Sequence, residues 1–145
     1  KDINRLIFCS GKIYFELQDH INELKINNVH IIRLEQLYPF PYEALKQITK
    51  KFIHCEMIWC QEEPKNMGAW QFIEDRLKSV FHIIDSKREL FFIGRRAAAS
   101  PATGVFDRHI SNQKNIIRLA TEATLDEVEK EKIGVSLVKY KLPIE

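Results

Sequence analysis

The sequence predicts an α/β fold: a three-layer sandwich in which a largely parallel sheet of four or five strands carries helices on both faces. Short apolar runs alternate with amphipathic segments from residue 6 to about residue 120, and a strand–helix–strand order requires crossover connections, which build parallel sheets. The apolar runs are continuous, as in strands that are buried on both faces. The 145 residues are 45% hydrophobic and 29% charged, which is the composition of a globular protein.

Each predicted strand is a short apolar run bounded by polar or turn residues. The four runs are 6–9, 29–34, 57–60 and 90–93. Apolar residues at helical spacing predict a helix after each run. The stripes are Ile13, Leu17, Ile21 and Leu24; Leu45, Ile48 and Phe52; Trp70, Ile73, Leu77 and Val80; and Phe106, Ile110, Gln113, Ile117 and Ala120. Asn27-Asn28 is expected to end the first helix.

The chain beyond residue 123 departs from this alternation. We therefore predict a domain over residues 1–123, followed by an extra helix and an extended tail of uncertain role over 124–145. Thr124 and Glu127 have the spacing of a capping box and predict a short helix that ends before Gly134. Val135–Leu142 is predicted to be an extended segment at an edge.

Composition narrows the function classes and the compartment. Twenty-two basic residues against 20 acidic ones give a net charge of +2, which favours neither a nucleic-acid nor a membrane partner. Three cysteines suggest a reducing, intracellular setting. The excess of Lys over Arg leans towards a bacterial cytoplasm, with the mitochondrial matrix as the eukaryotic equivalent. Because the chain enters a strand soon after Lys1, without an initiating Met, we expect a piece of a longer polypeptide.

Four strand-to-helix loops are expected to converge at the carboxyl edge of the sheet, where α/β domains usually bind ligands. They cover residues 10–12, 36–41, 61–68 and 95–104. Pro39 and Pro41 keep the second loop out of strand and helix interiors. In the first loop, Ser10-Gly11-Lys12 can either hold an anion on its N–H groups or form a plain turn and cap; the plain turn is favoured.

The third loop holds two adjacent carboxylates, Glu62 and Glu63. They can serve as an acid/base pair, or one of them can pair with Arg95 or Arg96 of the fourth loop. The second interpretation is favoured because neighbours in an extended segment point apart.

The end of the same loop turns into a helix. The sequence Asn66-Met67-Gly68 predicts a turn in which Gly68 takes an unusual backbone angle. Trp70 is either a stacking platform for a ligand or a packing residue in the first helical turn. Packing is favoured.

The fourth loop joins two arginines to a run of small residues, 97–104. Arg95 and Arg96 are suited to phosphate or carboxylate recognition. Small side chains also let another subunit approach closely. A ligand site and a subunit interface explain the loop equally well.

No residue is assigned as catalytic and no metal site is predicted. Cys55 and Cys60 have no second ligand pair, so zinc is disfavoured. A thiol enzyme using Cys9 or Cys60 is disfavoured too, because both lie in predicted core strands, where thiols are usually inert.

Four stretches carry a family resemblance, in order and in register. They are CSGK at 9–12, RLEQLYPFP at 33–41, WCQEEPKNMGAW at 59–70, and GR at 94–95 followed by ASPATG at 99–104. Over residues 5 to about 122 the chain resembles the carboxy-terminal domain of 2-oxoglutarate dehydrogenase, the thiamine diphosphate-dependent decarboxylating component of its complex. Arg96, Ala98 and the tail from Thr124 depart from the usual pattern.

The resemblance implies a transketolase-type carboxy-terminal fold with room for one antiparallel edge strand. It implies a parent enzyme that decarboxylates 2-oxoglutarate on thiamine diphosphate with Mg²⁺, both held by other domains, and passes the succinyl group to a lipoyl arm. The implied partners are the remaining domains of the parent chain, a homodimer partner and the lipoyl succinyltransferase component. The isolated domain is not expected to be active.

By the same resemblance, this domain supports the dimer and shapes the active-site surroundings. The candidate residues for that role are Glu62, Glu63, Asn66, Gly68, Trp70, Arg95, Ser100, Pro101 and Gly104. The alternative is a regulatory module that binds acetyl-CoA or a nucleotide at the carboxyl edge. Its candidate donors are Arg33, Arg95 and Arg96.

Overall fold

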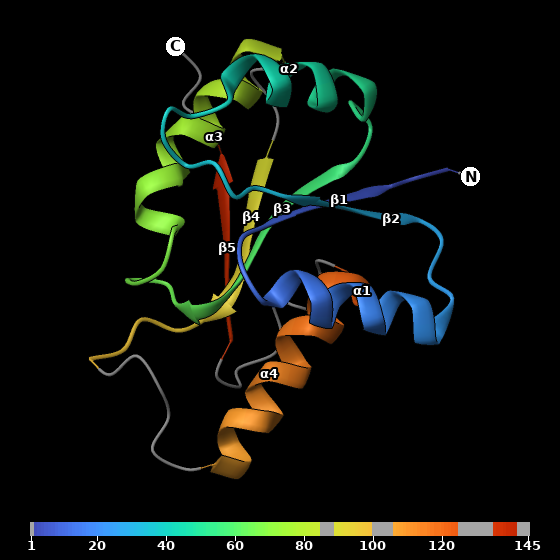
Figure 1. Ribbon diagram of the computed structural model, residues 1–145, viewed down its shortest axis with the longest axis vertical. Coiled ribbons are helices and arrows are strands. Elements are labelled where there is room, and N and C mark those ends of the chain that lie inside the picture. Colours follow the sequence, from blue (N-terminus) through green and yellow to red (C-terminus); the bar gives the residue numbers. More distant parts are fainter. Residues whose placement is uncertain (1, 85–88, 100–105, 125–134, 142–145) are drawn as a thin grey trace.

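The computed structural model describes residues 2–84, 89–99, 106–124 and 135–141 (Figure 1). Five strands and four helices alternate in these residues. In chain order they are β1 (Arg5–Cys9), α1 (Ile13–Leu24), β2 (Val29–Arg33), α2 (Tyr42–Lys51), β3 (Glu56–Pro64), α3 (Trp70–Ile84), β4 (Glu89–Arg95), α4 (Phe106–Thr121) and β5 (Val135–Lys141). The predicted alternation of strands and helices is confirmed.

The strands form one sheet in the order β2-β1-β3-β4-β5. Strand β1 lies between two parallel neighbours, so that Ile7 is level with Ile31 of β2 and with Ile58 of β3. Strand β4 is parallel to β3, and β5 runs antiparallel to β4. The predicted largely parallel sheet is confirmed, including the antiparallel edge strand that the family resemblance allowed.

Helices cover both faces of the sheet, and the side chains of β1 show how the layers divide. Ile7 and Cys9 pack with α1 and α4, whereas Leu6 and Phe8 pack with α2 and α3. All four side chains are 0% exposed. Figure 1 shows the same division, with α2 and α3 on one side of the sheet and α1 and α4 on the other. The three-layer sandwich and its doubly buried strands are confirmed.

The predicted helical stripes are buried in the centre and fail near some helix ends. All four stripe residues of α3 are at most 1% exposed. Leu24 and Ile110, however, are 49% and 39% exposed, so their assignment to the core is wrong. Helix α1 also ends before Asn27-Asn28, because Lys25 takes a left-handed φ of 54° and caps it.

Two boundaries differ from the sequence prediction or extend it. Strand β3 continues to Pro64, although the sequence predicted a loop from residue 61, because an apolar run marks only the buried centre of a strand. The extended tail is confirmed as β5, and it joins the same sheet as residues 1–123. The helix predicted after Thr124 lies outside the described residues. The boundary at residue 123 stays a prediction.

A buried arginine fastens the C-terminal end of α4 to the amino edge of the sheet. Arg5, 6% exposed, donates from Nε to Glu56 Oε2 at 2.9 Å. Its Nη1 donates to the carbonyls of Leu119 and Ala120 at 3.5 and 3.1 Å, and its Nη2 to the carbonyl of Ala123 at 2.8 Å. The carbonyls of Leu119 and Ala120 belong to the last turn of α4, whose orphan acceptors and partial negative charge suit a cation, and Ala123 lies just after the helix. We call Arg5, Glu56 and these carbonyls the amino-edge clamp.

Candidate functional site

The carboxyl edge of the sheet is the candidate site because its topology creates a natural crevice there. Strands β1 to β4 are mutually parallel, so the loops that follow them leave from one edge. Helix α1 leaves β1 towards one face, and α3 leaves the adjacent β3 towards the other. Ligands of open α/β sheets bind outside such a switch point.

A network of charged and amide groups fills this switch point. The Lys12 ammonium lies 2.6 Å from Glu16 Oε1 and 3.8 Å from Glu62 Oε2. Gln113 Nε2 donates to Glu16 Oε2 at 2.8 Å and to Glu62 Oε2 at 3.5 Å. Arg95 Nη2 donates to Gln113 Oε1 at 3.1 Å. We call these five residues the carboxyl-edge network.

Electrostatics within the network favour the charged form of Lys12. The hydrogen bond to Glu16 raises the pKa of Lys12, and the nearby charge of Glu62 adds to the effect. Glu16 and Glu62 are both 28% exposed at the side chain, so water also reaches them. Glu16 and Glu62 accept from Lys12 and Gln113, and the arrangement joins α1, the carboxyl ends of β3 and β4, and α4.

The two adjacent glutamates separate, as the extended backbone predicted. Glu62 enters the network, whereas Glu63 is exposed beside Gly68. The sequence favoured a direct pair between a glutamate and Arg95 or Arg96, but Glu62 and Arg95 are joined through a third side chain. Gln113 lies between them, accepting from Arg95 and donating to Glu62. A neutral amide can do both, which a carboxylate cannot.

The side chain of Gln61 organises the loop between β3 and α3. Gln61 is 2% exposed, and its Oε1 accepts from Trp59 Nε1 at 3.0 Å and from the Trp70 N–H at 3.2 Å. Its Nε2 donates to the carbonyls of Glu63, Pro64 and Met67 at 3.3, 3.1 and 2.9 Å. The loop is thus folded around one buried amide.

The other predicted residues of this loop have structural roles. Gly68 has a φ of +68°, which confirms the unusual backbone angle. Trp70 is 1% exposed and packs 5.0 Å from the Phe92 ring, in agreement with the packing interpretation. Asn66 exchanges two hydrogen bonds with the backbone of Ala98, at 2.9 and 3.1 Å, and so joins the third loop to the fourth.

The turn at Gly11 holds an anion that belongs to the protein itself. The Gly11 N–H donates to Glu35 Oε1 at 2.9 Å, and Arg33 Nε donates to the same oxygen at 2.6 Å. The backbone hydrogen bond from Gly11 and the bond from Arg33 lower the pKa of Glu35. Of the N–H groups considered for an external anion, that of Gly11 is therefore occupied by Glu35.

The three candidate arginines lie in different surroundings. Arg95 is 6% exposed and belongs to the network, whereas Arg96 is exposed. Arg33 follows β2, and its guanidinium lies 5.3 and 5.0 Å from the Tyr14 and Phe15 rings. Because β1 and β3 separate β2 from β4, Arg33 is about 14 Å from Arg95 at ordinary strand spacing. Ser100, Pro101 and Gly104 lie outside the described residues.

The cysteines of the two central strands are poor nucleophiles. Cys9 and Cys60 are both 0% exposed. Burial raises the pKa of Cys9 to about 12, with smaller and opposing effects from Arg33 and Glu35. Burial also raises the pKa of Cys60 well above its ordinary value. A thiolate, the reactive form, is thus disfavoured at both positions.

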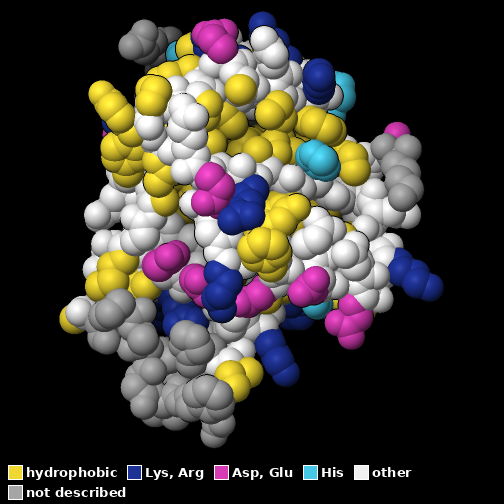
Figure 2. All heavy atoms as spheres, in the orientation of Figure 1, with side chains coloured by type: hydrophobic (Ala, Val, Ile, Leu, Met, Phe, Trp, Pro, Cys, Tyr) yellow, Lys and Arg dark blue, Asp and Glu magenta, His cyan; other side chains and the backbone are white. Residues whose placement is uncertain are grey.

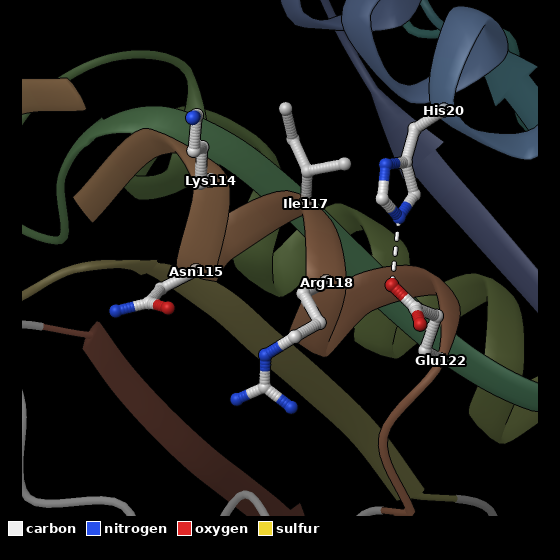
Figure 3. Close-up of a pocket in the computed structure, with 6 residues that line it drawn as sticks. All are labelled: His20, Lys114, Asn115, Ile117, Arg118 and Glu122. Atoms are coloured by element: carbon white, nitrogen blue, oxygen red, sulfur yellow. Dashed lines mark hydrogen bonds and ion pairs between the residues drawn. The ribbon is translucent and has the colours of Figure 1, made fainter. Parts of the chain in front are cut away.

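A pocket of about 330 Å³ lies elsewhere, between α1 and α4 (Figure 3). His20 Nε2 and Glu122 Oε1 are 2.7 Å apart and join the two helices at its rim. Figure 3 shows Lys114 and Arg118 pointing to opposite sides, so these cations do not converge on one ligand. None of the predicted site residues lines this pocket.

Sequence reasoning missed the residues that organise the edge. Glu16, Gln61 and Gln113 come from three separate elements, and only the fold brings them near the loops. One signal was available: Gln113 was the polar member of an otherwise apolar stripe. Such a position often marks a side chain with a buried partner.

The described ranges hold neither a candidate metal cluster nor a candidate membrane span. Over 2–84, 89–99, 106–124 and 135–141, no group of three or more His, Cys, Asp and Glu side chains is placed to hold a metal ion. In the same ranges, no helix is long and apolar enough to cross a membrane.

Fold and edge together define a doubly wound α/β domain whose switch point is bridged by its own polar side chains. Comparison with known proteins gives a family. The chain belongs to the 2-oxoglutarate dehydrogenase C-terminal family, whose model matches residues 1–121. This confirms the resemblance that the four sequence motifs carried.

Curated relatives agree with the family assignment. The chain is 49% identical over 110 residues to proteins named 2-oxoglutarate dehydrogenase E1 component from Brucella anthropi, Brucella ovis and Brucella canis. Each match covers 75% of this chain and 11% of the relative. The chain therefore spans about a tenth of the length of the curated relatives it matches.

Proposed function

We propose that this chain is the carboxy-terminal domain of an enzyme that oxidatively decarboxylates 2-oxoglutarate and transfers the succinyl group to a lipoyl arm. The single observation that carries the proposal is the family match over residues 1–121. The relatives named 2-oxoglutarate dehydrogenase E1 component, at 49% identity, support it. Because these relatives are bacterial, we place the enzyme in a bacterial cytoplasm.

The described residues do not fit thiamine diphosphate or its Mg²⁺. Three carboxylates at the carboxyl edge already have partners: Glu16 and Glu62 accept from Lys12 and Gln113, and Glu35 accepts from Gly11 and Arg33. The described residues also contain no group of three or more His, Cys, Asp and Glu side chains placed to hold a metal ion. We therefore place both groups, and the substrate pocket, in the remaining domains of the parent chain. No catalytic step is assigned to this domain.

The role proposed for the domain itself is to support the dimer and to shape the active-site surroundings. The network supports this role, because it fixes α1 and the carboxyl ends of β3 and β4, from which the loops leave, relative to α4. Glu62, Asn66 and Arg95 each contact a second loop or helix. The other partners proposed are a second copy of the enzyme and the lipoyl succinyltransferase component.

The test is an assay of the longer polypeptide that carries this chain. Purified with thiamine diphosphate and Mg²⁺, it should release CO₂ from 2-oxoglutarate and succinylate a lipoyl domain. Pyruvate is the control substrate. Release of CO₂ from pyruvate but not from 2-oxoglutarate would contradict the proposed substrate.

The alternative function is binding of acetyl-CoA or a nucleotide at the carboxyl edge. The exposed side chain of Arg96, next to the small residues of its loop, favours it. Arg96 directly follows β4 at the start of the small-residue loop, so it is the donor to change first. Calorimetry of the longer polypeptide should show heat with acetyl-CoA that Arg96→Ala removes. No heat with either ligand would discard this alternative.

A further inference from the structure

Two thiols of the core lie next to each other at the carboxyl ends of β1 and β3, and the proposed function does not use them. Strand β1 pairs with β3 in parallel, with Phe8 level with Trp59. The next position in each strand is a cysteine, Cys9 in β1 and Cys60 in β3. Both side chains belong to the core layer that α1 and α4 cover, so they lie on the same face of the sheet.

The spacing of the two strands permits a disulfide between these cysteines. Neighbouring strands lie about 4.8 Å apart, and the Cα atoms of bridged cysteines are usually about 4.4–6.8 Å apart. The two thiols also interact: burial is the main cause that raises the pKa of Cys60, and Cys9 adds to the effect. The third cysteine, Cys55, lies before β3 and in the opposite core layer, so the fold does not place it beside either of them.

The carboxyl-edge network closes over this end of the core layer. Lys12 and Glu62 follow Cys9 and Cys60 closely in the chain, and the Lys12 ammonium lies 3.8 Å from Glu62 Oε2. Gln113 of α4 donates to the same oxygen at 3.5 Å. Figure 2 shows a band of mixed acidic and basic side chains over α1, the other helix that covers this layer. Because both thiols are 0% exposed, an oxidant reaches them only when these contacts open.

We propose that Cys9 and Cys60 form an oxidisable dithiol, shielded by the carboxyl-edge network, whose disulfide rearranges that network. Bridged Cβ atoms lie about 3.8 Å apart, closer than neighbouring strands, so formation of the bond draws the carboxyl ends of β1 and β3 together. Lys12 and Glu62 follow these ends and move with them. In a reducing compartment such a bond is transient, as in proteins that sense oxidants. The dithiol does not depend on the reaction that the longer polypeptide catalyses.

The oxidant is a small hydroperoxide, and hydrogen peroxide is the simplest one. One thiol loses its proton, and the thiolate attacks a peroxide oxygen; the O–O bond breaks, and a sulfenic acid and water form. The second thiolate attacks the oxidised sulfur, the Sγ–Sγ bond forms, and the hydroxyl group leaves as a second water. The peroxide takes up the two electrons, and the two thiol protons end in the water molecules. Because burial disfavours both thiolates, the reaction is slow while the network is closed.

Oxidation of the longer polypeptide that carries this chain tests the proposal. The native protein is incubated with hydrogen peroxide, free thiols are alkylated, and its peptides are mapped without reduction. A linked pair of peptides that joins Cys9 to Cys60 is expected, with Cys55 recovered in the alkylated form. A mixture of pairs that includes Cys55 would overturn the proposal, because it is the product of an unfolded chain. Absence of the linked pair from both the wild type and Gln113→Leu would overturn it as well.

The rate of the reaction tests the shielding. Gln113→Leu removes hydrogen bonds that hold the network closed, so the linked pair should form about fivefold faster or more than in the wild type. Gln71→Leu, on the exposed face of α3, is the matched control and should react at the wild-type rate. Equal rates in all three proteins would show that the network does not shield the dithiol.

Amide exchange tests the effect of the bond on the loops. Exchange of residues 61–68 should change when the wild type is oxidised and stay the same in Cys60→Ala, which cannot form the bond. This variant also controls for peroxide oxidation of Met67 in the same segment. Exchange that changes equally in both proteins, or in neither, would overturn the proposed rearrangement.

Discussion

Two buried arginines hold α4 against the sheet, one at each edge, and they use different chemistry. Arg5 and Arg95 are both 6% exposed. Arg5 donates to three backbone carbonyls and to Glu56, so its acceptors are mostly main chain. Arg95 donates to the side chain of Gln113, which passes the contact on to Glu16 and Glu62. The amino-edge clamp completes a helix end, whereas the carboxyl-edge network connects loops.

This difference separates stability from adaptability. Three of the acceptors of Arg5 are main-chain carbonyls at the end of α4, which exist whatever the side chains are. The carboxyl-edge network depends on side chains from separate elements and is partly open to water, so each member can be exchanged at a smaller cost. We therefore expect substitutions at the amino edge to affect folding most, and substitutions at the carboxyl edge to affect the arrangement of the loops.

The largest effect is expected for Arg5→Met. It leaves the carbonyls of the last α4 turn and Glu56 without their donor, and should lower the free energy of unfolding by about 3 kcal/mol. Urea denaturation measures it. Arg76→Met, which removes an arginine stacked on Phe72 at the surface, is the matched control and should cost less than about 1 kcal/mol. Equal losses of stability in the two variants would show that the amino-edge clamp contributes no more than a surface arginine.

Gly68→Ala should follow, at about 2 kcal/mol. The residue has a φ of +68°, and a Cβ there would lie 3.1 Å from Glu63, so the backbone cost and a steric cost add. Gly11→Ala is the comparison: its φ is +75°, but no atom lies within 4 Å of its Cβ position. If both variants lose the same stability, the contact with Glu63 contributes nothing.

Gln113→Leu should cost about 1–2 kcal/mol, because Arg95, Glu16 and Glu62 each lose a hydrogen bond. It should also loosen the third and fourth loops, which proteolysis or amide exchange of residues 61–68 can detect. Gln71→Leu, on the exposed face of α3, is the control and should change neither. Unchanged exchange in Gln113→Leu would show that the loops are ordered independently of the network.

The smallest effect is expected for Glu35→Gln, and it depends on pH. Because Gly11 and Arg33 lower the pKa of Glu35 below its ordinary value of 4.5, the carboxylate contributes stability above pH 4.5 that is lost as the pH falls through the lowered pKa. The surface position limits this contribution to less than about 1 kcal/mol. The difference in stability between wild type and variant should therefore be constant near neutral pH and vanish in acid. A difference in stability that persists in acid would show that it does not come from the charge of the Glu35 carboxylate.

Most of the fold could be predicted because local patterns determine it. Continuous apolar runs located all four parallel strands, and the stripe of α3 was correct at every position. Leu24 and Ile110 were wrongly assigned to the core because the apolar periodicity of a helix continues past the point where the sheet stops covering it. The end of β3 was missed because Gln61 and Glu62 are polar, although they still lie in a strand.

The position of the candidate site in the fold was easier to predict than the contacts between its residues. Parallel strands guarantee that four loops meet at one edge, so Glu62, Asn66, Gly68 and Arg95 were found from their positions. Their contacts depend on Gln113, which lies 51 positions from Glu62 and 18 from Arg95. No local pattern contains such a distance, and only the packing of α4 sets it.

The span of the amino-edge clamp has a consequence for how the domain folds. Arg5 and Ala123 are 118 positions apart, yet Arg5 lies in β1, which has a neighbour on each side of the sheet. Strand pairing of β1 can begin once β2 has left the ribosome, but the guanidinium has to wait until α4 has been synthesised. Since such long loops close late, Arg5 stays solvated through most of translation and becomes buried only in the closing step. The Arg5 guanidinium should therefore become buried at the same time as the complete domain emerges from the ribosome.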